Sequence, residues 1–248
     1  RAAGIDAELA FVRGRDQGPL AQDVYGLKAF DRSLVYLPQE RRFASVVSDL
    51  LDAYTVPAAL EGAPALVIGE TGDGLQITPP SLAENETDTT QFSAFLDETG
   101  TLKLTITFGA TGNSQAWLRR LKDADDQRLR NQLQQFAAFI HPAAVLDDYG
   151  TTHLADLTEA PALTLFCTIP NYAVTAGALM LFNIPGLQYS AADVGKPSRD
   201  YDLFWLGAEK QSTIGAITLP EGYQVYSMPE DMVVDGPVAA YTARLIAA

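Results

Sequence analysis

The strongest pattern along the chain is a strict alternation of apolar and polar positions between residues 101 and 108. Leucine, isoleucine or phenylalanine occupies every even position, and lysine or threonine occupies every odd one. A period of two is typical of a β-strand with one buried face and one solvent-exposed face. A second β-rich run lies at 91–96, and the segment 97–100 between the two runs has the composition of a turn. The pattern therefore predicts a β-hairpin.

A different spacing follows in residues 114–140. Apolar residues recur there at helical intervals, at positions 117, 118, 121, 129, 133, 136 and 140. Asn113 or Ser114 can cap the first turn, and a His-Pro pair follows the last apolar position. We therefore predict one long helix over residues 114–140. Its middle, residues 119–130, interleaves Arg, Lys and Asp, a mixture that is typical of a solvent-exposed helix face.

The rest of the chain is predicted to be mainly β-structure. Short β-rich runs come first, at residues 9–13, 33–37 and 63–69. Further runs, separated by Pro and Gly, follow after residue 161, at 163–169, 178–184, 201–206, 213–219, 223–228 and 239–246. Strands at this spacing favour a β-sandwich. The sequence therefore predicts an α+β chain whose second part is a β-sandwich-rich region with one long helix.

Composition excludes several classes of function. The chain has 248 residues, a net charge of −14 and a pI near 4.4. Binding to a nucleic-acid backbone requires clustered Lys and Arg, so this charge argues against nucleic acid as a partner. No apolar run approaches the roughly 20 residues that span a bilayer, and we predict no transmembrane segment. A single Cys gives no disulfide framework within the chain.

Several phrases together resemble bacterial transglutaminase-like proteins. Residues 1–18 read RAAGIDAELAFVRGRDQG and residues 29–38 read AFDRSLVYLP, and both are similar to the second half of that family's papain-type core. Later phrases, RDYDL at 199–203 and LPEGYQV at 219–225, are similar to its C-terminal β-domain. The resemblance implies that residues 1–60 are the C-terminal half of a degenerate transglutaminase-like core and that residues 61–248 form the sandwich-rich region.

The same resemblance implies that the catalytic positions are lost. Arg32 stands where the family has its catalytic His, Ser45 is the best match to the catalytic Asp, and the Cys-bearing segment has no counterpart. A thiolate nucleophile needs a neighbouring base, and a guanidinium group cannot serve as one. We expect Arg32 and Asp31 instead to pair with charged residues of the first strand and its loop, namely Arg13, Arg15 or Asp16.

This reading predicts a pseudo-enzyme that needs no cofactor. We expect a non-catalytic structural or interaction module that docks to another polypeptide. Because the proteins that it resembles are often exported, the resemblance also implies the periplasm or cell envelope of a bacterium.

The beginning of the chain suggests where such a partner would bind. Residue 1 lies inside what the resemblance reads as the end of the Cys-bearing helix, so we expect a fragment or a processed product. Without that helix, apolar side chains of residues 1–60 would lie uncovered. We predict an interface with another polypeptide, either the missing N-terminal part or a separate subunit, that includes Ile5, Leu9, Phe11, Leu34 and Tyr36.

Two other functions stay open. A thiol acyl-transfer enzyme, transglutaminase or peptidase, would need a Cys-bearing half upstream and a new base such as His141 or His153. Cys167 lies in an alternating run and is predicted to be buried. A glycan or small-ligand binder would use the sandwich face, with Tyr201 and Trp205 as candidate aromatic contacts. The deciding observations are a histidine within hydrogen-bonding reach of the thiol and a concave pocket that exposes Trp or Tyr.

Overall fold

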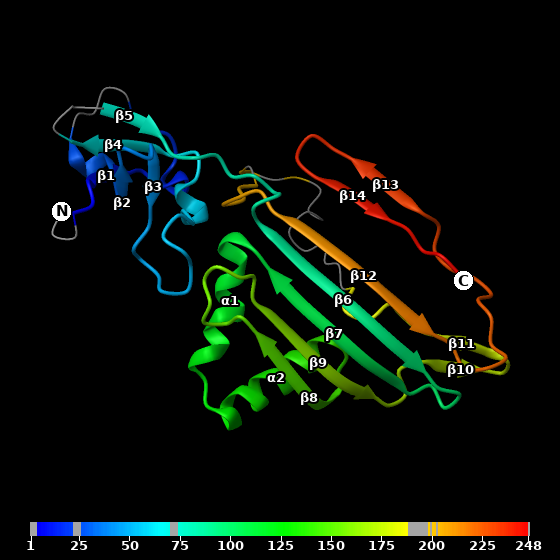
Figure 1. Cartoon of the computed structure of the whole chain (residues 1–248). Coiled ribbons are helices and arrows are strands. Elements are labelled where there is room, and N and C mark those ends of the chain that lie inside the picture. The colour runs from blue at the N-terminus through cyan, green and yellow to red at the C-terminus, as the bar shows by residue number, and fades with distance from the viewer. Residues whose placement is uncertain are drawn as a thin grey trace.

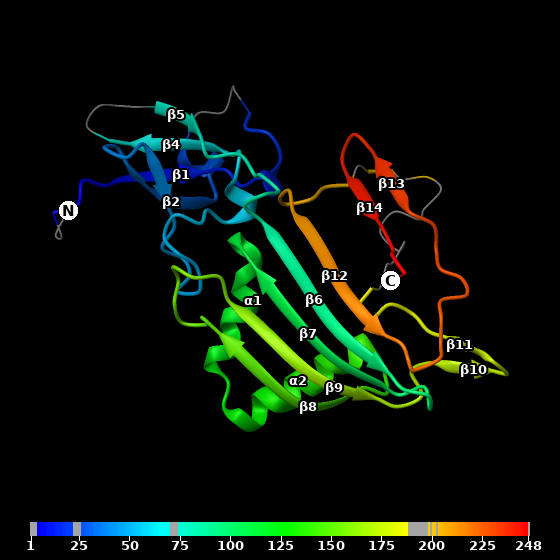
Figure 2. The ribbon, with the colours of Figure 1, turned by 45° about the vertical axis from the view of Figure 1, so that its right-hand side comes forward.

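The described residues form two five-stranded sheets, and helices cover one face of the second (Figure 1). The computed structural model describes residues 4–21, 26–69, 74–187, 198, 200–201 and 203–247. Arg1, Arg199 and Asp202, which belong to the family-like phrases, lie outside the described residues. Strands outnumber helices, so the expected α+β composition is confirmed. Figures 1 and 2 show the first sheet beside one end of the second.

The first sheet is antiparallel throughout and has the strand order β3-β2-β1-β4-β5. Its strands are β1 (Glu8–Val12), β2 (Arg32–Leu37), β3 (Arg42–Ala44), β4 (Pro64–Ile68) and β5 (Gly74–Ile77). One face packs on the segment around the 3-10 turn Ala58–Leu60. The buried cluster there consists of Ala10, Val12, Leu34, Tyr36, Phe43, Val56, Leu60, Ala63, Ala65 and Val67.

The first sheet extends beyond the predicted boundary near Leu60. Strand β4 pairs with β1, and β5 pairs with β4, so the first unit continues to Ile77. Thr78 closes it, because its buried hydroxyl accepts a hydrogen bond from Ala63 N at 2.8 Å and donates to the Leu60 carbonyl at 2.5 Å. A boundary at residue 60 was wrong because the apolar run at 63–69 pairs backwards in sequence.

The second sheet has the order β12-β6-β7-β9-β8, and only β12 runs parallel to its neighbour β6. Its strands are β6 (Thr87–Leu96), β7 (Leu102–Ala110), β8 (Val145–Thr152), β9 (Ala162–Ile169) and β12 (Lys210–Thr218). The predicted hairpin is confirmed: Leu96 pairs with Leu102, and Leu104, one of the predicted inward positions, is buried. The runs predicted at 163–169 and 213–219 correspond to β9 and β12.

The predicted single helix over residues 114–140 is wrong. The structure has α1 (Gln115–Arg119), a 3-10 turn (Arg120–Asp123) and α2 (Asp126–Ile140). Asp125 has extended backbone angles, and its side chain accepts a hydrogen bond from Arg128 N at 2.9 Å. This N-cap starts a new helix and lets α2 turn away from α1. The predicted end at residue 140 is confirmed.

The expected β-sandwich is not seen among the described strands. The second sheet carries α1 and α2 on one face, and its buried residues pack against them (Figure 2). The remaining strands form small hairpins, β10 (Val174–Ala176) with β11 (Leu179–Leu181) and β13 (Met232–Asp235) with β14 (Ala240–Ala243). The runs predicted at 178–184 and 239–246 are therefore shorter than expected, and the described residues of 201–206 and 223–228 form no strand.

Side-chain contacts join the two units. The Asn113 amide donates to the Val56 carbonyl at 3.0 Å and to the buried Glu86 carboxylate at 2.8 Å. On the other side, the Arg15 guanidinium donates to the Leu206 carbonyl at 2.9 Å. The first sheet therefore contacts both the start of the helical layer and the segment that leads into β12.

A fully buried guanidinium lies under α1. Arg119 has an exposed fraction of 0% and donates to Gln115 Oε1 at 3.0 and 2.7 Å. It also donates to the carbonyls of His153 and Asp156, both at 2.7 Å, and of Glu159 at 2.8 Å. Burial lowers the pKa of Arg119, yet an arginine stays charged in a protein. The expectation that residues 119–130 form only a solvent-exposed face is wrong at this position.

We expect Arg119→Met to lower the free energy of unfolding by about 3 kcal/mol or more, because it leaves several buried carbonyls without a donor. Arg120→Met removes the same charge from the exposed neighbouring position and should change stability by about 0.5 kcal/mol or less. Urea denaturation of the two variants measures the difference. Similar losses in both would contradict a structural role for the buried guanidinium.

Candidate functional site

The position that the resemblance assigns to a catalytic histidine holds an exposed ion pair. Arg32 opens β2, and its guanidinium contacts the Asp31 carboxylate at 2.5 Å and the Asp16 carboxylate at 3.8 Å. The predicted pairing with Asp16 is confirmed. Asp31 also accepts a hydrogen bond from Gly14 N at 2.8 Å, which fixes the loop after β1. Ser45 is buried, and its backbone N donates to the Ala53 carbonyl at 2.6 Å.

The single thiol lies in the core of the second sheet. Cys167 has an exposed fraction of 2%, which confirms the predicted burial. Burial, with a smaller contribution from the Asp147 charge, raises the pKa of the Cys167 thiol to about 11. A reactive cysteine needs a lowered pKa and access to solvent. The surroundings of Cys167 supply neither.

Neither histidine serves this thiol. His141 ends α2 and packs on the Tyr172 ring at 5.3 Å, and its Nδ1 accepts a hydrogen bond from Ala143 N at 3.1 Å. His153 is exposed and has a positive φ of 54°, and its carbonyl accepts from Arg119. In the described part of the chain, no hydrogen bond joins a histidine to Cys167, and no group of three His, Cys, Asp or Glu residues is placed to hold a metal ion.

The outer face of the first sheet is apolar as well as the inner one. Leu9 lies opposite Val35 on one side and Ile68 on the other, and Leu66 lies between Phe11 and Leu75. Directly paired residues point to the same side of a sheet. We call this surface the outer apolar face; it consists of Leu9, Phe11, Val35, Leu66, Ile68, Leu75 and Ile77. Leu75 and Ile77 are 56% and 62% exposed.

Two residues of the predicted interface lie on the opposite side of this sheet. Leu34 and Tyr36 have exposed fractions of 3% and 6% because they pack into the core with Ala10 and Val12. The prediction was wrong for them because both faces of β1 and β2 carry apolar residues. The sequence pattern therefore does not indicate which set of alternate residues points to solvent. Leu9 and Phe11 do belong to the outer apolar face.

Other members of the outer apolar face were missed at the sequence level. They come from β4 and β5, and these strands lie in the region 61–248 that the sequence analysis placed in a second domain. The sequence PALVI at 64–68 could have indicated them, because its odd and even positions are both apolar and such a strand places apolar residues on both faces of a sheet. Ile5 precedes β1 and is exposed, as expected.

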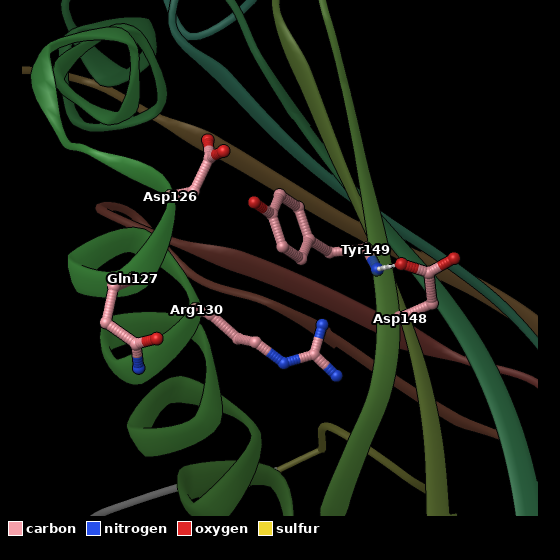
Figure 3. Close-up of a pocket in the computed structure, with 5 residues that line it drawn as sticks. All are labelled: Asp126, Gln127, Arg130, Asp148 and Tyr149. Atoms are coloured by element: carbon pink, nitrogen blue, oxygen red, sulfur yellow. Dashed lines mark hydrogen bonds between the residues drawn. The ribbon is translucent and has the colours of Figure 1, made fainter.

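A polar hollow of about 450 Å³ lies between α2 and β8 (Figure 3). Tyr149 and Arg130 lie between the helix and the strand, whereas Asp148 is turned away from the helix. The Arg130 guanidinium already donates to the Asp147 carbonyl at 2.9 Å. This contact ties α2 to the edge strand, so the hollow has a structural explanation.

Comparisons of the chain with protein-family models, with curated proteins and with solved structures each give no match. Among the described residues, no helix is both long enough and apolar enough to cross a bilayer.

The buried thiol gives a prediction about pH. With a pKa of about 11, roughly 0.1% of Cys167 is thiolate at pH 8, against about a quarter at an unfolded-state pKa near 8.5. We therefore expect the native protein to react with Ellman's reagent at least about 100-fold more slowly than the urea-unfolded chain. Because the folded-state pKa is raised, this group's contribution to stability should be lost as pH rises from about 8.5 to 11. Rapid labelling of the native protein at pH 8 would contradict the burial.

Proposed function

We propose that this protein is a non-catalytic structural or interaction module, derived from a transglutaminase-like protein, that docks to another polypeptide through its outer apolar face. The observation that carries the proposal is the exposure of that face, which holds leucine, isoleucine, valine and phenylalanine. On β1, β4 and β5 the face has no charged residue, and Arg42 of β3 lies at its opposite border.

An antiparallel sheet with one face in water normally carries polar residues on that face. The first sheet instead carries mostly apolar residues on both faces, a pattern that is typical of a sheet covered on both sides. Complete burial of one Leu or Ile side chain is favourable by about 1.5–3 kcal/mol. Covering several half-exposed side chains together would therefore stabilise a complex strongly, and contiguous apolar patches usually mark an interface.

The chemistry of the face also describes the partner. A surface whose exposed residues are mostly apolar favours an apolar protein surface rather than a charged ligand. Strand β5 adds an open edge, because among the described strands it pairs only with β4. An extended segment of the partner can add to this edge and lay apolar side chains beside Leu75 and Ile77.

The chemistry at the family-like position Arg32 and at the chain's single thiol, which is not a family-like position, supports a role without catalysis. Arg32 is ion-paired and cannot act as a base, and the buried Cys167 has a raised pKa. We propose no cofactor for the module. On the resemblance, its place would be the periplasm or envelope of a bacterium.

Site-specific photocrosslinking in the native host tests the docking. We expect a benzophenone amino acid in place of Leu75 to form one discrete adduct with another polypeptide, because β5 lies within the proposed interface. The matched control replaces Phe95, which is 46% exposed on the outward side of the second sheet. Adding Ile68→Lys should remove the Leu75 adduct. The same set of adducts from both positions, or none from Leu75, would overturn the proposal.

A transamidase assay with an amine donor and a glutamine-containing protein tests the absence of catalysis. We expect no turnover above background from the chain, and none from Arg32→His, because a base alone does not restore a thiolate or its orienting carboxylate. A transamidation rate in the unmodified chain that thiol reagents abolish would contradict the proposal that the protein is a pseudo-enzyme.

A further inference from the structure

A groove of about 500 Å³ runs between the two helices on the covered face of the second sheet. Trp117 and Leu121 line it from the side of α1, and Leu133 and Phe136 line it from α2. Leu163 of β9 contributes from the sheet below. The groove exists because the chain breaks between the helices at Asp125. A volume of 300–1,000 Å³ with mostly apolar walls is typical of a small-molecule site.

Aromatic packing holds the walls in place. The Phe108 ring lies 5.0 Å from the Phe136 ring and 6.5 Å from Trp117, both edge-on, and the Trp117 and Phe136 centroids are 5.8 Å apart. Trp117 is nevertheless 36% exposed. A preorganised aromatic pair with an open side favours a flat ligand, because ring–ring contacts then form at little entropic cost.

Two arginines line the rim of the groove, although the chain as a whole is strongly acidic. Arg120 and Arg128 line it and are exposed, and within the described residues neither guanidinium makes a hydrogen bond or ion pair. Asp123 also lines the groove, but it forms no ion pair with either arginine within 4.0 Å. In a chain of net charge −14, two unpartnered guanidinium groups beside an apolar groove are complementary to an anion with an apolar body.

We propose that this groove binds a small planar aromatic carboxylate. The ring packs against Trp117 and Phe136, and the carboxylate accepts hydrogen bonds from Arg120 and Arg128. The planar fork of arginine matches a carboxylate in geometry as well as in charge. This site differs from the ligand binder that the sequence left open on a sandwich face, because Tyr201 and Trp205 lie in no strand and do not line the groove. It lies in the helical layer, away from the outer apolar face, so it stands independently of the docking proposal.

The experiment uses 2-naphthoate as the probe and its uncharged analogue 2-naphthamide as the control ligand. Trp205→Phe leaves Trp117 as the sole tryptophan of the two in the chain. The indole N–H cross-peak in a ¹⁵N spectrum then reports on the groove alone. We expect 2-naphthoate to shift this peak saturably and to bind about tenfold more tightly than 2-naphthamide.

The double variant Arg120→Gln/Arg128→Gln, in the same background, should weaken 2-naphthoate about tenfold and leave 2-naphthamide unchanged. The double variant Lys103→Gln/Lys122→Gln removes the same charge from exposed positions that do not line the groove. It should leave both affinities unchanged, and its melting temperature should match that of the arginine variant. No saturable shift with 2-naphthoate, equal affinity for the two compounds, or equal losses in the two double variants would overturn the proposal.

Discussion

The helical layer of this protein depends on one buried positive charge. A guanidinium group without water must find polar partners on every side, and Arg119 finds them in Gln115 and in the carbonyls of residues 153–159. These carbonyls belong to the connection between β8 and β9, where His153 adopts a left-handed backbone conformation. The contact therefore fixes α1 to the far edge of the sheet. Trp117, two residues before the buried arginine, is held in place by the same anchor.

In the first unit, too, an arginine side chain donates hydrogen bonds to several backbone carbonyls. Arg13 leaves the end of β1, and its guanidinium donates to the carbonyls of Gly18 and Ala29, both at 2.9 Å. The planar fork of arginine suits this task because it can serve several carbonyls in one plane. Arg15 reaches the other unit instead, at the Leu206 carbonyl. Cations are few in this acidic chain, and several of them hold loops rather than pair with carboxylates.

The sequence predicted those strands in which apolar residues occupy only every second position. Leu104 and its neighbours in β7 alternate cleanly, and both the strand and its buried face were correct. The first sheet was harder because it is apolar on both faces, so Leu34 was placed on the wrong side. The helix break at Asp125 had a signal, an N-cap residue inside a helical pattern, but the apolar spacing continues across it. The burial of Arg119 could not be predicted, because the backbone carbonyls that it contacts lie more than thirty residues away in the sequence.

The two surfaces proposed to bind ligands differ in shape and in charge. The outer apolar face, which we propose as the docking surface, has no charged residue on β1, β4 and β5 and belongs to a sheet with an open edge, features that suit a broad protein surface. The groove between the helices is concave and carries unpartnered guanidinium groups. A net charge of −14 repels anions at long range, but physiological salt screens that repulsion beyond about 8 Å. Selection of an anion by the groove therefore depends on direct contact with Arg120 and Arg128, not on the field of the whole chain.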